Sequence, residues 1–260
     1  MKVKRIVKQW RYPEASERQL SRSLTQFASD LVVYARDQLD TMRFDATDQE
    51  IDNAEKSLED YAAELLESLV MALPAFAYQI YKFNSQQWLD VAKSAGGKKN
   101  QSVIWLIAFG ANGQEPWYQE KESQWLSLTE ASYRKLANDI ISDWSQNVRL
   151  ANIKAKGREY VDEVIEQRYK VYTGWTVNRS RGIVATWNSL LMRQRLEDAG
   201  VTHYLWRGKL DERERLKHLR WEGKRIGVES DHVFPGEEYG CRCWAEPDFE
   251  GKEDDNETAL

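Results

Sequence analysis

The sequence predicts a mostly α-helical protein, with an N-terminal helical region followed by a small α+β C-terminal domain. Two observations lead to this fold class. Up to Gly200, apolar residues recur at steps of three and four, which is the period of one helix face. After Gly200 the pattern changes: "THYLW" alternates as a strand does, and "HVFPGEEYGCRCWAEP" has the turn residues that precede a short strand.

The composition is that of a globular protein and limits its partners. The chain has 260 residues, of which 42% are hydrophobic and 30% are charged, so it can bury a substantial core. Its net charge is −5, from 37 Lys and Arg against 42 Asp and Glu, which disfavours nonspecific nucleic-acid binding by the whole surface but leaves room for a local basic patch. No unbroken apolar stretch reaches the ~20 residues of a membrane span, so we expect no membrane partner.

The region from residue 14 to 90 is predicted to be helical. Thr47 and Glu50 have the spacing of a capping box, which predicts that a second helix begins there. Pro74 is expected to kink or end that helix. The first two helices each carry one apolar face, so we expect them to pack as an antiparallel hairpin.

The main organisational boundary is predicted within residues 94–117, where Gly- and Asn-containing turns flank the apolar run "VIWLIAF". Periodicity leaves open whether this run is a short buried strand or a turn of core helix. The predicted division is an N-terminal helical region over 1–93, a connector over 94–124, a helical and α+β domain over 125–248, and a disordered acidic tail over 249–260.

Three further helices are predicted between this boundary and the C-terminal domain. Ser127 and Glu130 have capping-box spacing and predict the start of the first. A second is expected to end near Gly174, and Gly200 is expected to be the C′ residue of the third.

Both cysteines of the chain stand on either side of Arg242. If "GCRCW" is a strand, Cys241 and Cys243 face one side and Arg242 faces the other. A disulfide between residues i and i+2 would be strained, so a redox pair is disfavoured. Two alternatives remain: the cysteines are small buried hydrophobic residues, or they are metal ligands.

As metal ligands, the two cysteines would combine with His218 and with either His232 or Asp231 in a structural zinc site. We expect no cofactor, and zinc is the one alternative that stays open.

The segment "LDERERLKHLRWEG" admits three interpretations. As a helix it would pair Asp211 with Arg215 on the surface. As a catalytic segment, Asp211 and His218 would serve as base and orienter, or would bind a metal. As a structural clasp, a buried arginine would hold carboxylates and the histidine would lie in the core. The sequence has no nucleophile elbow, P-loop or dinucleotide fingerprint, and the clasp is the favoured interpretation.

The C-terminal segments occur in a characteristic order. A helix with "RSRGIVATWNSLLMRQRLEDAG" is followed by "VTHYLW", an Asp/Arg segment with a His, "EGKRI" and "FPGEEYGCRC". This order resembles the C-terminal domain of the bacteriophage Mu F-like family, the phage head morphogenesis or minor head proteins. The resemblance is specific over about 176–246 and looser back to about 125. The matched positions are Arg181, Thr186, Trp206, Asp211, Arg213, His218, Gly223, Pro235, Gly236, Cys241, Arg242 and Cys243.

Two positions depart from the family pattern. Ala185 stands where the family often has arginine, and "LK" replaces the Pro or Thr often found before the histidine.

The resemblance implies a non-enzymatic virion protein of a tailed phage, made in the bacterial cytoplasm and located in the head near the portal. It implies the portal protein and capsid or scaffold proteins as partners, and a role in head assembly that can extend to DNA packaging or ejection. In this interpretation Arg213 and Arg242 are satisfied by carboxylates, and Pro235 and Gly236 shape the turn before the last strand. Two alternatives stay open: a metal-dependent nuclease or group transferase using Asp211 and His218, and a non-catalytic inner-capsid DNA-binding protein.

Overall fold

The chain forms two compact units. The computed structural model describes residues 6–41, 47–154, 156, 158–212 and 214–250. One unit, which we call the bundle unit, comprises Glu14–Ala77 and Glu122–Ile183. The other, the sheet unit, comprises Met1–Pro13, Tyr78–Lys121 and Val184–Leu260. Each unit therefore combines residues from the predicted N-terminal region and from the predicted C-terminal domain. The predicted region limits at residues 93 and 124 do not coincide with the limits of the two units.

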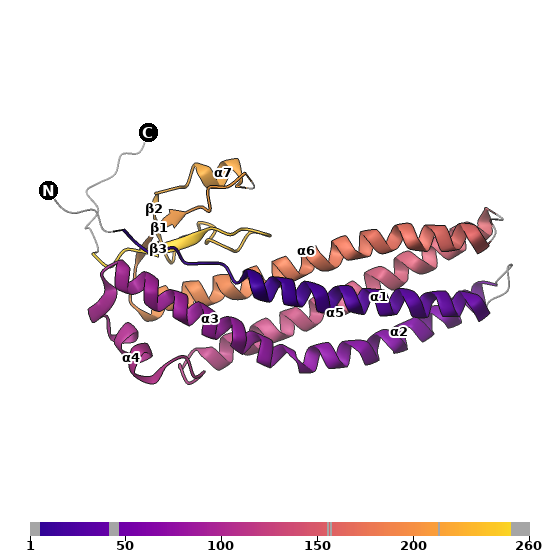
Figure 1. Ribbon diagram of the computed structural model, residues 1–260, viewed down its shortest axis with the longest axis horizontal. Coiled ribbons are helices and arrows are strands. Elements are labelled where there is room, and N and C mark those ends of the chain that lie inside the picture. Colours follow the sequence, from indigo (N-terminus) through magenta and orange to yellow (C-terminus); the bar gives the residue numbers. More distant parts are fainter. Residues whose placement is uncertain (1–5, 42–46, 155, 157, 213, 251–260) are drawn as a thin grey trace. The chain divides into compact units, whose positions relative to one another are not determined.

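The predicted fold class is confirmed, because helices make up most of the described chain and a small sheet lies near its C-terminal end (Figure 1). The elements in order are α1 (Glu14–Thr41), α2 (Asp48–Met71), α3 (Leu73–Ser94), the 3₁₀ turn η1 (Gly97–Lys99), α4 (Gln101–Phe109), α5 (Tyr118–Ile153), α6 (Arg158–Asp198), β1 (His203–Arg207), α7 (Leu216–Leu219), β2 (Arg225–Gly227) and β3 (Trp244–Pro247).

In the bundle unit, α1 and α2 form the predicted hairpin. The Tyr34 ring of α1 stacks on Tyr61 of α2 with centroids 4.3 Å apart, and its hydroxyl lies 2.8 Å from Ser57 Oγ. The buried face of α2 consists of Ile51, Ala54, Leu58, Ala62 and Leu66.

Two long helices complete the bundle unit. Thr25 of α1 lies 2.9 Å from Thr176 of α6 through their hydroxyl oxygens. Asp143 of α5 forms an ion pair with Arg168 of α6 at 2.6 Å, and Asp52 of α2 forms one with Arg149 of α5 at 2.6 Å. A second α1–α6 pair, Arg36 with Glu166, shows that these two helices run antiparallel. Helices α1, α2, α5 and α6 therefore form a four-helix bundle.

The predicted capping box at the start of α2 is confirmed. Thr47 Oγ1 accepts a hydrogen bond from the Glu50 backbone N–H at 3.3 Å, and Glu50 Oε2 accepts one from the Thr47 N–H at 2.7 Å. The predicted end near Pro74 is also confirmed: α2 ends at Met71, and Pro74 lies in the first turn of α3, where its missing N–H has no intrahelical partner to lose.

We expect Thr47→Ala to lower the free energy of unfolding of the bundle unit by about 1 kcal/mol, because it removes one half of the capping box. Thr47→Ser keeps a hydroxyl at the same position and should stay within a few tenths of a kcal/mol of wild type. Urea unfolding followed by far-ultraviolet circular dichroism measures both, and an alanine variant as stable as the serine variant would contradict the prediction.

Two predicted helix boundaries are wrong. Ser127 and Glu130 lie inside α5, and Gly174 lies inside α6, so each region is one long helix. A helix-interior glycine costs only ~1 kcal/mol, which burial of the apolar residues on either side of it offsets.

The predicted helix end at Gly200 is confirmed. Gly200 has a φ of +63° and donates its N–H to Glu197 O, while Val201 donates to Leu196 O, both at 2.9 Å. These two bonds are those of a Schellman motif.

The apolar run after residue 100 forms helix α4, so it is a helix and not a strand, but it is not the core helix that the second alternative described. Only Val103 and Leu106 of this helix are buried, whereas Ile104, Ile107 and Phe109 are exposed. The run is therefore a surface helix of the sheet unit with one buried edge.

The sheet unit is built around strand β1. β1 pairs antiparallel with β2 on one side and with β3 on the other. Trp206 of β1 lies in a core that also contains Trp88 and, from the N-terminal segment, Trp10. Phe249 packs on Trp88 with ring centroids 6.1 Å apart, so this first residue of the predicted tail belongs to the folded unit; residues 251–260 of the tail lie outside the described residues.

One helical run, Asp48–Ser94, is long and apolar enough to cross a membrane on length and composition alone. An 18-residue window within it has a mean hydropathy of 1.2, and 28% of that window is buried inside the protein. The sequence expectation is that no unbroken apolar stretch reaches ~20 residues, and this criterion of mean hydropathy over a window does not test it. Core helices of soluble proteins meet the same criterion, and the absence of a membrane partner stays a prediction.

Candidate metal centre

The two cysteines lie in the loop that leads into β3. Both are buried, and no disulfide joins them. Strand β3 begins only after them, at Trp244. The predicted alternation nevertheless holds at the side chains. Cys241 and Cys243 face His218, whereas Arg242 points away and donates to Asp211 Oδ1 at 2.7 Å.

His218 lies on the short helix α7 and is only 1% exposed. Its Nδ1 is 3.7 Å from Cys241 Sγ and 3.4 Å from Cys243 Sγ. These three donor atoms all lie within 4.8 Å of one another, so the structure brings together three of the four ligands that the sequence predicts.

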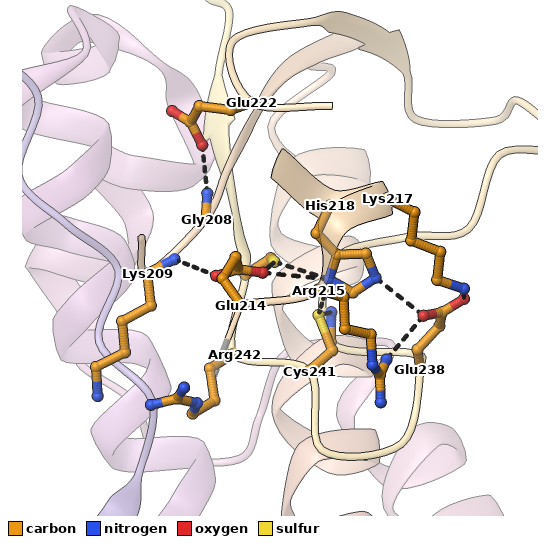
Figure 2. A network of polar contacts seen from close by, with 12 residues as sticks. Gly208, Lys209, Glu214, Arg215, Lys217, His218, Glu222, Glu238, Cys241 and Arg242 are labelled. Carbon is orange, nitrogen blue, oxygen red and sulfur yellow. Dashed lines mark hydrogen bonds and ion pairs between the residues drawn. The ribbon is translucent and has the colours of Figure 1, made fainter. Parts of the chain in front are cut away.

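Glu214 also reaches this cluster, although the sequence did not single it out. Its Oε1 is 3.2 Å from Cys243 Sγ. The same oxygen lies 3.3 Å from His218 Nδ1 (Figure 2). Its other oxygen, Oε2, accepts a hydrogen bond from the Lys209 backbone N–H at 2.9 Å. The signal available in the sequence was the spacing of Glu214 and His218, four residues apart.

A second carboxylate orients the imidazole from its opposite edge. His218 Nε2 lies 2.9 Å from Glu238 Oε2, and Glu238 is also held by Lys217 and by Arg215 (Figure 2). Burial raises the pKa of Glu238, but the hydrogen bonds from Lys217 and His218 outweigh it and lower that pKa to about 2. Glu238 is therefore a carboxylate at neutral pH.

The two thiols influence each other. The hydrogen bond with Cys243 lowers the pKa of the Cys241 thiol to about 6, and a backbone N–H donated by Gly236 at 3.4 Å adds to this effect. The same pairing raises the pKa of Cys243, and burial adds to that. Of the two sulfurs, the pairing favours the thiolate form at Cys241 and disfavours it at Cys243.

His232, the fourth ligand predicted from the sequence, lies outside this cluster. Its Nδ1 is 2.8 Å from Val233 O, and its ring packs edge-on against Trp221 and Trp206, with centroids 4.4 and 5.7 Å away. Asp231, the other predicted possibility, is exposed. The loop holding these residues turns before it returns to the cysteines, a path that residue spacing does not specify.

Of the three interpretations of the Asp/Arg segment, the one that makes it a surface helix is wrong, because only Leu216–Leu219 is helical. Asp211 binds Arg242, and Arg215 binds Glu238 at 2.8 Å, so the expected Asp211–Arg215 pair is replaced by two longer-range pairs. The predicted carboxylate partner of Arg242 is confirmed. Arg213 lies outside the described residues.

Two matched residues of α6 are not part of the metal cluster. Arg181 belongs to the bundle unit, where its Nε lies 3.4 Å from Glu17 Oε1. Thr186 is exposed. The matched residues are therefore found in the bundle unit, on the surface and in the cluster around His218, and not at one site.

Glycine and proline residues of the matched set shape the turns around the cluster. Gly223 has a φ of +75° and donates its N–H to Trp206 O at 2.8 Å. Pro235 O accepts a hydrogen bond from Ser189 Oγ at 2.9 Å, and the next residue, Gly236, has a φ of +91°. The predicted turn before the last strand is confirmed.

Gly236→Ala should lower the free energy of unfolding by about 1–2 kcal/mol, because its φ disfavours any side chain. An added Cβ would also lie 3.0 Å from Ser189 Cβ. Gly174→Ala is the matched control: this helical glycine has nothing within 4 Å of an added Cβ, and alanine should stabilise by about 0.5–1 kcal/mol. The midpoint of thermal unfolding should fall in Gly236→Ala and rise in Gly174→Ala. Shifts of the same sign would contradict the role of Gly236 as a turn glycine.

The arrangement favours metal binding over acid–base catalysis. The imidazole of His218 is buried, and both of its nitrogens face protein groups, so it offers no free nitrogen to a substrate proton. Two thiols and an imidazole nitrogen converge, and a carboxylate oxygen of Glu214 lies beside Cys243 and His218. Sulfur, nitrogen and oxygen donors of this kind are a ligand set for a borderline-soft cation.

Comparisons with known proteins give limited information. A Haemophilus influenzae (strain ATCC 51907 / DSM 11121 / KW20 / Rd) protein, described as uncharacterized, is 29% identical over 164 residues. These residues are 60% of this chain and 35% of that protein, so the match spans about a third of the relative's length. No protein-family model and no solved structure matches the chain.

Proposed function

We propose that this protein is a minor head protein of a tailed bacteriophage, which binds the portal vertex or the inner capsid during procapsid assembly. The proposal rests on the ordered C-terminal segments from about 176 to 246 that resemble the Mu F-like family. What supports it is the role of the matched residues that gather in the sheet unit. They build turns, fill the core and close a buried polar cluster, as the residues of a structural module do.

The exposed face of α4 is consistent with a protein that works through partners. Ile104, Ile107 and Phe109 present large apolar side chains to solvent on one short helix. Adjacent exposed apolar side chains are typical of interaction surfaces.

The catalytic alternative has less support. It requires His218 and Asp211 to act on a substrate, but His218 is buried between Glu214, Glu238 and two thiols, and Asp211 is engaged by Arg242. No described feature favours the DNA-binding alternative either.

The test is co-expression with the portal protein of the phage genome that carries this chain, followed by size-exclusion chromatography of the purified mixture. We expect co-elution at a mass above that of the portal ring alone. A portal protein from an unrelated phage is the control and should elute separately. Clean separation of the two folded proteins from the same phage would contradict the proposal.

A further inference from the structure

We propose that the sheet unit holds one structural Zn²⁺ ion, bound by Glu214 Oε1, His218 Nδ1, Cys241 Sγ and Cys243 Sγ. The proposal concerns the described residues around α7 and the loop before β3 and is independent of the proposed role in phage assembly.

Four separations between the proposed donor atoms, from 3.2 to 3.7 Å, are close to those of a zinc tetrahedron. Zinc binds sulfur at about 2.3 Å and nitrogen or oxygen at about 2.0–2.2 Å, which places tetrahedral ligands roughly 3.4–3.8 Å apart. The observed separations are 3.7 and 3.4 Å from His218 Nδ1 to the sulfurs of Cys241 and Cys243. Glu214 Oε1 lies 3.2 Å from Cys243 Sγ and 3.3 Å from His218 Nδ1.

The charges at this point call for a cation. The Glu214 side chain is only 6% exposed, and its inward oxygen faces the Cys243 thiol, a weak hydrogen-bond donor, and His218 Nδ1. Burying a carboxylate costs several kcal/mol unless a positive group compensates it. A zinc ion in contact with Glu214 Oε1 and both sulfurs supplies that charge.

Hydrogen bonds from neighbouring groups orient His218, Glu214 and Cys241, as is usual for metal ligands. His218 Nε2 contacts Glu238, which leaves the Nδ1 lone pair to face the sulfurs; metal-binding histidines commonly use this carboxylate–imidazole–metal arrangement. The Lys209 N–H fixes the outer oxygen of Glu214, and the Gly236 N–H fixes Cys241 Sγ. Each of these ligands thus has a second partner that sets its orientation.

The ligand set selects zinc and a structural role. Two thiolates with an imidazole suit Zn²⁺ and not Mg²⁺ or Ca²⁺, which prefer oxygen ligands. Four protein ligands leave no open position for a substrate, as in structural zinc sites. The ion would join Glu214 and His218 to the Cys241–Cys243 loop and so stabilise the segment that carries β2.

A metal-free arrangement predicts a different outcome. A doubly protonated His218 could bridge Glu214 and Glu238 as an imidazolium ion, with both cysteines as neutral thiols. Such a protein would fold without zinc and would not take it up.

The first experiment measures zinc in the purified, reduced full-length protein by inductively coupled plasma mass spectrometry. We expect one zinc per chain, and loss of that zinc in Cys243→Ser and His218→Gln. His232→Gln should keep one zinc per chain, because His232 lies outside the cluster. A folded wild-type protein that contains no zinc and takes up none on reconstitution would overturn the proposal in favour of the imidazolium arrangement.

The fourth ligand is tested by a matched pair of glutamate variants. In competition with a chromophoric chelator, Glu214→Gln should bind zinc at least ~10-fold more weakly, the scale that even outer-sphere changes reach. Glu212→Gln, an exposed neighbour two residues away, should match wild type. Equal affinity of the two variants would remove Glu214 from the ligand set.

A measurement on the wild-type chain covers the case in which the variants fail to fold. Co²⁺ in place of zinc should give thiolate-to-metal charge-transfer absorption and the intense visible bands of a tetrahedral site. A spectrum with only weak octahedral bands would contradict ligation by the two cysteines.

Discussion

Glu115→Ala should lower the free energy of unfolding by about 3–5 kcal/mol, because it leaves the buried guanidinium of Arg195 without its counter-charge. The side chains of Arg195 and Glu115 are 2% and 3% exposed and form an ion pair. Burial raises the pKa of Glu115 and lowers the pKa of Arg195, and their mutual attraction opposes both shifts. Tyr81 donates to the second carboxylate oxygen, and Ser85 Oγ accepts from Arg195 Nη2 at 2.7 Å.

The pair lies between parts of the sheet unit that are far apart in sequence. Glu115 precedes α5, and Arg195 lies near the end of α6, where its guanidinium also lies over the Trp117 ring at 4.8 Å. Removing the carboxylate therefore leaves a charge that cannot reach solvent without unpacking α6.

The double variant Glu115→Leu/Arg195→Met separates loss of the pair from loss of packing. Apolar residues of similar size often replace a buried ion pair without cost, so the double variant should recover most of the lost stability. Urea unfolding followed by tryptophan fluorescence measures all three proteins. A single variant with the midpoint of wild type, or a double variant no better than the single one, would refute this account.

Trp206→Ala should destabilise the sheet unit by about 3–5 kcal/mol, the usual cost of truncating a buried tryptophan. Trp206 is fully buried in the central strand β1, and its ring contacts those of His218, Trp221 and His232 at centroid distances of 5.3, 4.8 and 5.7 Å. The cavity would open beside α7, so the loss should extend to the geometry of the metal cluster.

Two controls accompany this variant. Trp206→Phe keeps an aromatic ring in the core and should cost less than the alanine variant. Phe109→Ala removes a side chain that is 63% exposed and should stay within about 0.5 kcal/mol of wild type. Differential scanning calorimetry gives the ranking, and a Trp206→Ala protein as stable as Phe109→Ala would show that β1 is not the centre of this core.

Local residue patterns were enough to predict the fold class and several element ends. The capping box at Thr47, the helix break near Pro74 and the Schellman end at Gly200 depend on residues within a few positions of one another. The same local rules failed at Ser127 and Gly174, because in α5 and α6 the burial of an apolar face outweighs a weak preference for a helix end.

The candidate metal site was predictable only in part. The sequence predicted that Cys241 and Cys243 face one side if their segment is extended, and it offered His218 as a candidate partner, since alternation and residue type are local properties. Only the tertiary structure decided that Glu214 completes the cluster and that His232 packs on tryptophan rings instead. The physical reason is that this choice depends on the path of the chain between α7 and β3, which long-range pairing with β1 fixes and residue spacing does not.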